Sequence, residues 1–169
     1  MWQVTIPALV AALAALTGVT LGALLEPFKL RAVRLARIRQ DRADRSAKLI
    51  ETAMNCRARL LSLNIIHRQN AAGKPPSGAS EEDRLDAYRN ARNDFRKAVA
   101  LLELSGPDEL AAAASSVRKA EDEFRAQRYT LDDDTSIGQD YPPLAVLVKM
   151  RELEEAVHEF ARAARRYMS

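Results

Sequence analysis

Residues 4–25 form an uncharged, mostly apolar run, and this run constrains the chain more than any other feature. At about 1.5 Å per residue, a helix over the run would be about 33 Å long, which matches a hydrocarbon core about 30 Å thick. The sequence therefore predicts a single transmembrane helix over residues 1–25. A buried soluble helix would normally carry a polar stripe, and a cleaved signal peptide would carry positive charge before its apolar stretch. These two alternatives are disfavoured because the run has neither feature.

The segment after this run is strongly basic. Residues 26–70 carry eleven basic and four acidic side chains, whereas residues 71–169 carry fifteen basic and nineteen acidic ones. Since basic residues beside a membrane span lie on the cytoplasmic side, we expect a single-pass cell-membrane protein with its N-terminus outside and its C-terminal domain in the cytoplasm. Residues 26–48 would form a juxtamembrane stalk helix. Its expected contacts with anionic lipid headgroups are Lys29, Arg31, Arg34, Arg37 and Arg39, although these charges would also suffice to set topology alone.

Two further features concern the predicted anchor. Pro27 cannot donate a backbone hydrogen bond, which predicts a kink or an interruption of the helix at the membrane exit. Ala14, Gly18 and Gly22 recur at four-residue spacing, a pattern that lets membrane helices pack closely and predicts a possible homo-oligomer. In an alanine-rich run this spacing also arises by chance.

The rest of the chain divides into helical segments at three breaks, which lie at residues 70–80, 105–107 and 128–143. Helices are expected over residues 28–69 and 81–104, from Pro107 as first helical residue, and from near Pro143. Short turns make neighbouring helices antiparallel. The predicted fold class is all-α: an N-terminal single transmembrane helix followed by an antiparallel, coiled-coil-like bundle of four helices over residues 49–169. A three-helix arrangement and a dimer of helical hairpins are alternatives.

Apolar residues recur in each segment with a period near 3.5, which is typical of bundle cores. Arg92 interrupts the second stripe, and the third stripe is mostly alanine. The four predicted stripes are Leu49, Ala53, Cys56, Leu60, Leu63 and His67; Leu85, Tyr88, Phe95, Val99 and Leu102; Leu110, Ala113, Val117, Ala120 and Phe124; and Val146, Met150, Leu153, Val157, Phe160, Ala164 and Tyr167.

Motifs that would carry chemistry are weak. Glu155 and His158 have the i, i+3 spacing of a di-iron ligand pair, but they lie off the predicted core stripe and have no second pair. Residues 132–136 begin like a calcium loop, yet Ile137 and Pro143 stand where glycine and glutamate are required. Cys56, the single cysteine, is expected to be a buried inert thiol. The sequence thus predicts no catalytic residue, no cofactor and no metal site.

Binding to macromolecules is the remaining class of function. The positive charge lies where the membrane is expected, so we predict no nucleic-acid face, and no small-molecule substrate site is visible. The main hypothesis is a membrane-anchored scaffold or protein-interaction module whose protein partner is unknown. Its expected partner surface is the alanine-rich third helix, at Ala113, Ala114 and Val117. The alternative hypothesis is a small membrane-active or sensing protein, holin-like or toxin-like, that oligomerises through its anchor.

Overall fold

The structure is a computed structural model that describes the backbone of residues 5–74, 78–130 and 141–168, and the side chains of Glu26 and of residues 29–74, 78–130 and 141–167. It contains the helices α1 (Thr5–Ala71), α2 (Glu81–Ser105), α3 (Asp108–Ala126) and α4 (Leu144–Met168). The chain is all-helical across its described residues, which confirms the predicted helical class. It divides into two units, Met1–Asp41 and Arg42–Ser169, and each is considered by itself.

In the first unit, α1 runs without interruption through Glu26 and Pro27. An interruption at Pro27 is therefore wrong, whereas the other predicted outcome, a kink, stays a prediction. The side chains of the predicted anchor, residues 1–25, lie outside those that the structure describes. Within the part of the chain that it does describe, no helical stretch meets the length and hydropathy that a membrane crossing requires.

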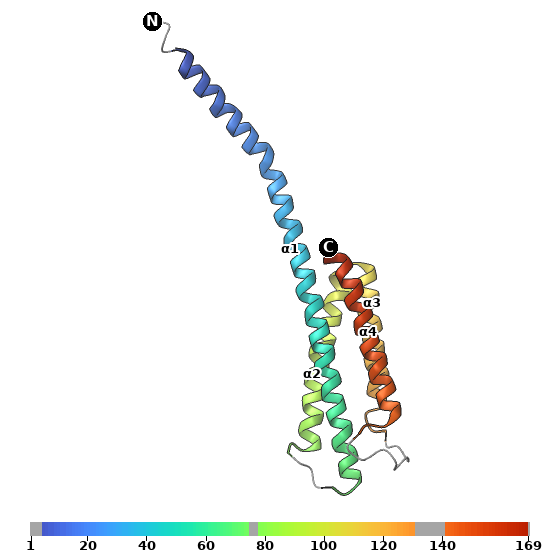
Figure 1. The fold of residues 1–169 in the computed structure, drawn as a ribbon. Coiled ribbons are helices and arrows are strands. Elements are labelled where there is room, and N and C mark those ends of the chain that lie inside the picture. Colours follow the sequence, from blue (N-terminus) through green and yellow to red (C-terminus); the bar gives the residue numbers. More distant parts are fainter. Residues whose placement is uncertain (1–4, 75–77, 131–140, 169) are drawn as a thin grey trace. The chain divides into compact units, whose positions relative to one another are not determined.

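In the second unit, the C-terminal half of α1 and the helices α2, α3 and α4 lie side by side as a bundle (Figure 1). The end of α1, the start of α2, the end of α3 and the start of α4 meet at one end of this bundle. We call it the Ala71 end. The α2–α3 turn and the end of α4 lie at the other end, so consecutive helices are antiparallel.

Local signals set where the helices begin and end. Ser80 and Asp83 form a capping box at the start of α2, in which each backbone N–H donates to the other side chain at 3.0–3.1 Å. Gly106 ends α2, and a Cβ there would lie 2.6 Å from the backbone oxygen of Leu102, so a larger residue would force a shift. Pro107 is the N-cap of α3 in extended conformation, so α3 begins one residue later than expected.

The core follows the predicted stripes closely in α1, α2 and α4. In α3, however, the buried residues are Leu110, Ala114, Val117, Glu121 and Phe124. Ala113 and Ala120, which were expected in this stripe, are only half-buried. A charged residue, Glu121, thus occupies a core position at 1% exposure. The buried apolar core residues are Leu49, Ala53, Cys56, Leu60, Leu63, Ile66, Tyr88, Ala91, Phe95, Ala98, Val99, Leu102, Leu110, Ala114, Val117, Phe124, Val146, Leu153, Val157, Phe160, Ala163 and Ala164.

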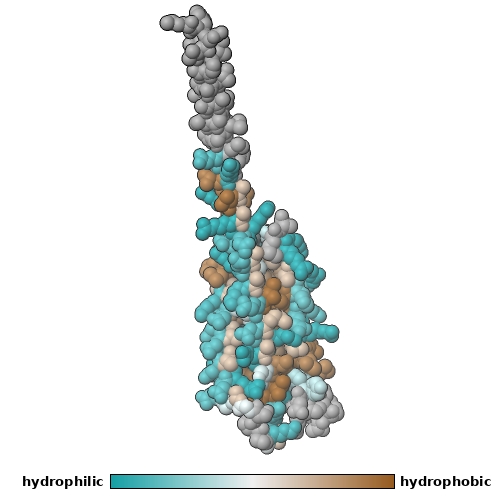
Figure 2. All heavy atoms as spheres, turned by 60° about the vertical axis from the view of Figure 1, so that its left-hand side comes forward, coloured by the Kyte–Doolittle hydropathy of each residue, from teal (hydrophilic) through white to brown (hydrophobic). Residues whose placement is uncertain are grey.

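The surface of the bundle is mostly polar. On the face that Figure 2 shows, hydrophilic side chains cover most of the helices and apolar residues appear in small separate groups. Such scattered apolar exposure is normal for a folded protein in water.

Candidate functional site

Glu121 is the centre of a buried polar cluster that joins three helices. Its carboxylate accepts hydrogen bonds from the Tyr88 hydroxyl at 2.8 Å and from Arg92 Nε at 3.1 and 3.2 Å. The Cys56 thiol lies 3.7 Å from the same carboxylate. These partners come from α1 (Cys56), α2 (Tyr88 and Arg92) and α3. A buried charge is tolerated only when it is paired and hydrogen-bonded, and this cluster meets both conditions.

Arg92 carries the charge that balances Glu121. Its Nη2 also donates to Asp122 at 2.6 Å, so one guanidinium binds two consecutive residues of α3. Burial by itself would lower the pKa of Arg92, but the charge of Glu121 and its hydrogen bonds outweigh burial and raise it. The guanidinium is therefore a fixed positive charge at the α2–α3 interface.

The two neutral members of the cluster resist ionisation. Burial is the main cause that raises the pKa of the Cys56 thiol, and the nearby charge of Glu121 raises it further. The same two causes raise the pKa of the Tyr88 hydroxyl. A thiol becomes a nucleophile or a metal ligand through its thiolate form. Cys56 is a buried core residue, as the sequence predicted, and its slow reaction stays a prediction.

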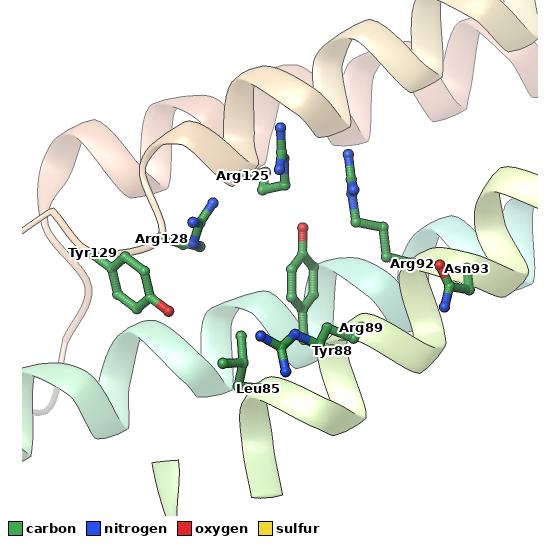
Figure 3. A pocket seen from close by; sticks show the side chains of 8 residues that line it. All are labelled: Leu85, Tyr88, Arg89, Arg92, Asn93, Arg125, Arg128 and Tyr129. Atoms are coloured by element: carbon green, nitrogen blue, oxygen red, sulfur yellow. The ribbon is translucent and has the colours of Figure 1, made fainter. Parts of the chain in front are cut away.

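A pocket of about 330 Å³ opens beside this cluster, between the N-terminal half of α2 and the C-terminal end of α3 with the turn that follows it. Figure 3 shows Tyr88 and Arg92 rising from α2 toward α3, with Arg125 and Arg128 on the α3 side. Among the described residues, the lining contains four arginines and no carboxylate. We call it the arginine–tyrosine pocket; it is lined by Leu85, Tyr88, Arg89, Arg92, Asn93, Arg125, Arg128 and Tyr129.

The arginines of the pocket are held in different ways. Arg89 pairs with Asp86 at 2.9 Å on the exposed side of α2. Arg125 Nε lies 3.7 Å from Asp122, close enough for an ion pair but too far for a hydrogen bond. This Nε is buried and has no hydrogen-bond partner among the described atoms. The pocket therefore contains donor capacity that the described carboxylates do not saturate.

The rim of the pocket is ordered by aromatic contacts. The guanidinium carbon of Arg128 lies 4.8 Å from the ring centre of Tyr129, in a cation–π arrangement. The other neighbour of Tyr129 is the His67 ring, at 4.8 Å between centres. His67 Nδ1 in turn lies 2.8 Å from Glu81 at the start of α2. His67, predicted as the last residue of the first apolar stripe, is half-buried and links the end of α1 to both α2 and the pocket rim.

The pocket was not predicted, although its charged residues are visible in the sequence. Arg92 stands at a core position of the second stripe, and Glu121 follows the 4–3 spacing of the third stripe from Leu110 through Ala114 and Val117. Opposite charges at core positions of neighbouring antiparallel helices predict a buried ion pair. The sequence contains this signal, but it is visible only when the spacing of the second stripe is compared with the spacing of the third.

The structure corrects the predicted partner surface. Ala114 and Val117 are both 0% exposed, so they belong to the core and are not available to a partner. Ala113 is half-buried and packs against the same core. The close packing that alanine permits explains this outcome, because small side chains let α3 approach its neighbours.

The other predicted sites have mixed outcomes. The expected lipid-contacting residues are exposed on α1; they are Lys29, Arg31, Arg34, Arg37 and Arg39. Ala14, Gly18 and Gly22 lie outside the described side chains, and so does the acidic loop at 132–136. Glu155 and His158 are both exposed on α4. The described residues contain no cluster of three or more histidine, cysteine or acidic side chains that would hold a metal.

Comparison with protein-family models, with curated proteins and with solved structures finds no match to this chain.

Proposed function

We propose that this protein is a membrane-tethered helical bundle that binds a protein partner at the cytoplasmic face of the cell membrane. The observation that carries the proposal is the exposed basic surface of α1, which directly follows the uncharged run of residues 4–25. Long arginine side chains at such a position reach anionic headgroups and keep their end of the helix in the cytoplasm.

The continuity of α1 supports a tether. The same helix that begins at Thr5 ends at Ala71 inside the bundle. A bundle joined in this way to an anchor would be confined to the membrane surface. Confinement raises its effective concentration for partners at that surface without any new contact.

The chemistry of the bundle supports a binding role. Its core is packed with aliphatic and aromatic side chains, and one of its pockets is lined mostly by arginine and tyrosine. These two residue types are enriched in the regions of protein interfaces that contribute most binding energy. The pocket therefore takes the place of α3 as the expected partner surface.

The test is membrane fractionation of the full chain with a C-terminal tag, combined with protease treatment of spheroplasts. The tag should sediment with membranes and should be cut only after lysis. Replacing Leu13 and Leu16 together by arginine should release the chain, because each charge at the centre of a span costs about 2.5–3.5 kcal/mol of insertion free energy.

The matched control replaces Leu30 and Leu35 by arginine. Both are exposed on α1 beyond the uncharged run, at 65% and 59% exposure, so the same chemical change should leave the chain in the membrane fraction. A wild-type chain that stays soluble, or a tag that is cut in intact spheroplasts, would refute the tether or its orientation.

A further inference from the structure

We infer that the arginine–tyrosine pocket is the docking site for an acidic, carboxylate-rich segment of a protein partner. The inference rests on the proposed function in one respect, since it takes the bundle to be a protein-binding module. It adds the location of the binding site and the chemistry of what enters it.

Charge is the first argument. Arg89, Arg92, Arg125 and Arg128 line one pocket of about 330 Å³, and no described carboxylate lines it. Three nearby carboxylates are already committed, and one of them, Asp86, pairs with Arg89 at 2.9 Å. Glu121 is 1% exposed and bound to Arg92, and the single carboxylate of Asp122 lies within 4 Å of three arginines. Positive charge therefore exceeds negative charge here, although residues 71–169 as a whole are net acidic.

The identity of the side chains indicates what kind of anion fits. A guanidinium presents paired N–H donors that match both oxygens of a carboxylate, and such bonds are stronger than neutral ones. The side chains of Arg89 and Arg125 are 63% and 39% exposed, so an incoming carboxylate can reach their guanidinium groups. The rings of Tyr88 and Tyr129 provide flat apolar walls for the rest of the segment.

A small cofactor is a poorer occupant. Small-molecule sites are lined mostly by apolar side chains, with a few polar groups that fix orientation. Here the proportions are reversed, because Leu85 is the single aliphatic residue among the described lining. Arginine clusters of this kind are a recurrent means of recognising acidic peptide segments.

A lipid headgroup of the protein's own membrane is also a poorer occupant. Asn64 Nδ2 donates to the backbone oxygen of Arg128 at 3.1 Å, which places the pocket rim beside residue 64 of α1. At about 1.5 Å per residue, this is about 33 Å along α1 from Arg42, where the bundle begins. The pocket is thus near the Ala71 end, far from the end at which α1 enters.

The pocket is also pre-organised. Arg92 is fixed by Glu121 and Asp122, while Arg128 lies over a Tyr129 ring that itself contacts His67. Side chains that are already ordered lose less conformational entropy on binding, so more of the electrostatic attraction appears as affinity.

The experiment measures binding of short synthetic peptides to the full chain in a neutral detergent. The peptides have a glycine–serine background with zero, two or four aspartates, and a matched set carries asparagine instead. Fluorescence anisotropy with an uncharged dye reports binding. We expect saturable one-to-one binding that strengthens with the number of aspartates and weakens as salt is raised.

Two double variants separate the pocket from general electrostatics. Replacing Arg89 and Arg128 by glutamine should weaken binding of the four-aspartate peptide at least about tenfold, because two charge-assisted contacts are lost. Replacing Arg162 and Arg165 by glutamine removes the same charge from exposed positions on α4, outside the pocket, and should change affinity less than about twofold. Thermal unfolding of both variants checks that the bundle is intact.

Several results would overturn the inference: absence of saturable binding, equal binding of the asparagine peptides, or equal weakening by both double variants. Sedimentation with anionic vesicles that depends on Arg89 and Arg128 would assign the pocket to lipid instead. Membrane fractionation of the Arg89→Gln/Arg128→Gln chain keeps the two proposals distinguishable. If the wild-type chain fractionates with membranes but does not bind the peptides, the pocket alone is refuted. If the chain binds the peptides but stays soluble, the tether alone is refuted.

Discussion

Arg92 Nε donates to both carboxylate oxygens of Glu121, at 3.1 and 3.2 Å, across the interface between α2 and α3. The two side chains are 16% and 1% exposed, so this ion pair lies within the core. Such pairs contribute less to stability than hydrophobic packing of the same volume, but breaking one leaves an uncompensated buried charge. The pair therefore fixes how α2 and α3 meet, and it orients Arg92 in the wall of the pocket.

Replacing Glu121 by glutamine should destabilise the bundle by about 2–3 kcal/mol, because Arg92 would lose its buried counter-charge while keeping Asp122. Urea unfolding of the full chain in neutral detergent measures this change. The control is Glu159→Gln, which removes a carboxylate at 72% exposure and should change the free energy of unfolding by less than about 0.5 kcal/mol. Equal effects of the two substitutions would contradict the buried pair.

Stability should fall at alkaline pH because of Cys56 and Tyr88. Both have a raised pKa in the folded chain, so above their ordinary values of 9.0 and 10.0 the unfolded chain releases protons that the folded chain retains. Their contribution is complete below pH 9 and is lost as pH rises through this range, with a slope of up to about 1.4 kcal/mol per pH unit for each group.

The urea midpoint measured from pH 8 to pH 11 tests this pH dependence. Cys56→Ala should reduce the slope that begins near pH 9, because one of the two retained protons is removed. An unchanged slope in this variant would show that Cys56 does not contribute.

The thiol of Cys56 should react slowly in the native chain. It is 0% exposed and its pKa is raised by burial, so reaction with an aromatic disulfide reagent requires the bundle to open. We expect labelling at least about a thousandfold slower than in denaturing urea, given ordinary domain stability. Because the chain has one cysteine, the signal has a single source. The variant Cys56→Ala/Ala112→Cys, with an exposed thiol on α3, should react rapidly without denaturant.

Ala114→Leu should destabilise the bundle by about 1–3 kcal/mol, because a fully buried position has no room for three more carbon atoms. Ala112→Leu, two residues earlier and exposed, is the matched control and should be nearly neutral. Thermal unfolding of both variants is the measurement. If Ala114→Leu left stability unchanged but abolished partner binding, the alanine-rich face would have to be restored as an interface.

Much of the bundle was predictable because its helices are amphipathic and their boundaries carry clear local signals. Most of the predicted stripe of α4 is buried, at Val146, Leu153, Val157, Phe160 and Ala164, while Met150 and Tyr167 are half-buried against the core. The start of α2 was predicted at residue 81, and the capping box of Ser80 and Asp83 confirms it. Such features depend on residues close together in the chain, so a single sequence is sufficient to reveal them.

The phase of the α3 stripe was predicted less well for a physical reason. Residues 111–114 are four consecutive alanines, so hydropathy there does not distinguish the buried side of the helix from the exposed side. The next uncertain position is Glu121, which a hydrophobic pattern assigns to the surface because carboxylates are rarely buried. Hydropathy therefore favours Ala120 over Glu121 in the stripe, and it does not separate Ala113 from Ala114.

By itself, then, the sequence determined the helices, most of their buried faces and the charge boundary after residue 25. Only the tertiary structure decided that Glu121 is buried, that Arg92 and Tyr88 reach it, and that four arginines from α2, α3 and the turn after α3 share one pocket. Helix formation and amphipathicity are local properties, encoded within a few turns. The pairing of a core arginine with a core glutamate depends on how two helices align across the bundle, and that alignment is set by packing of the whole core.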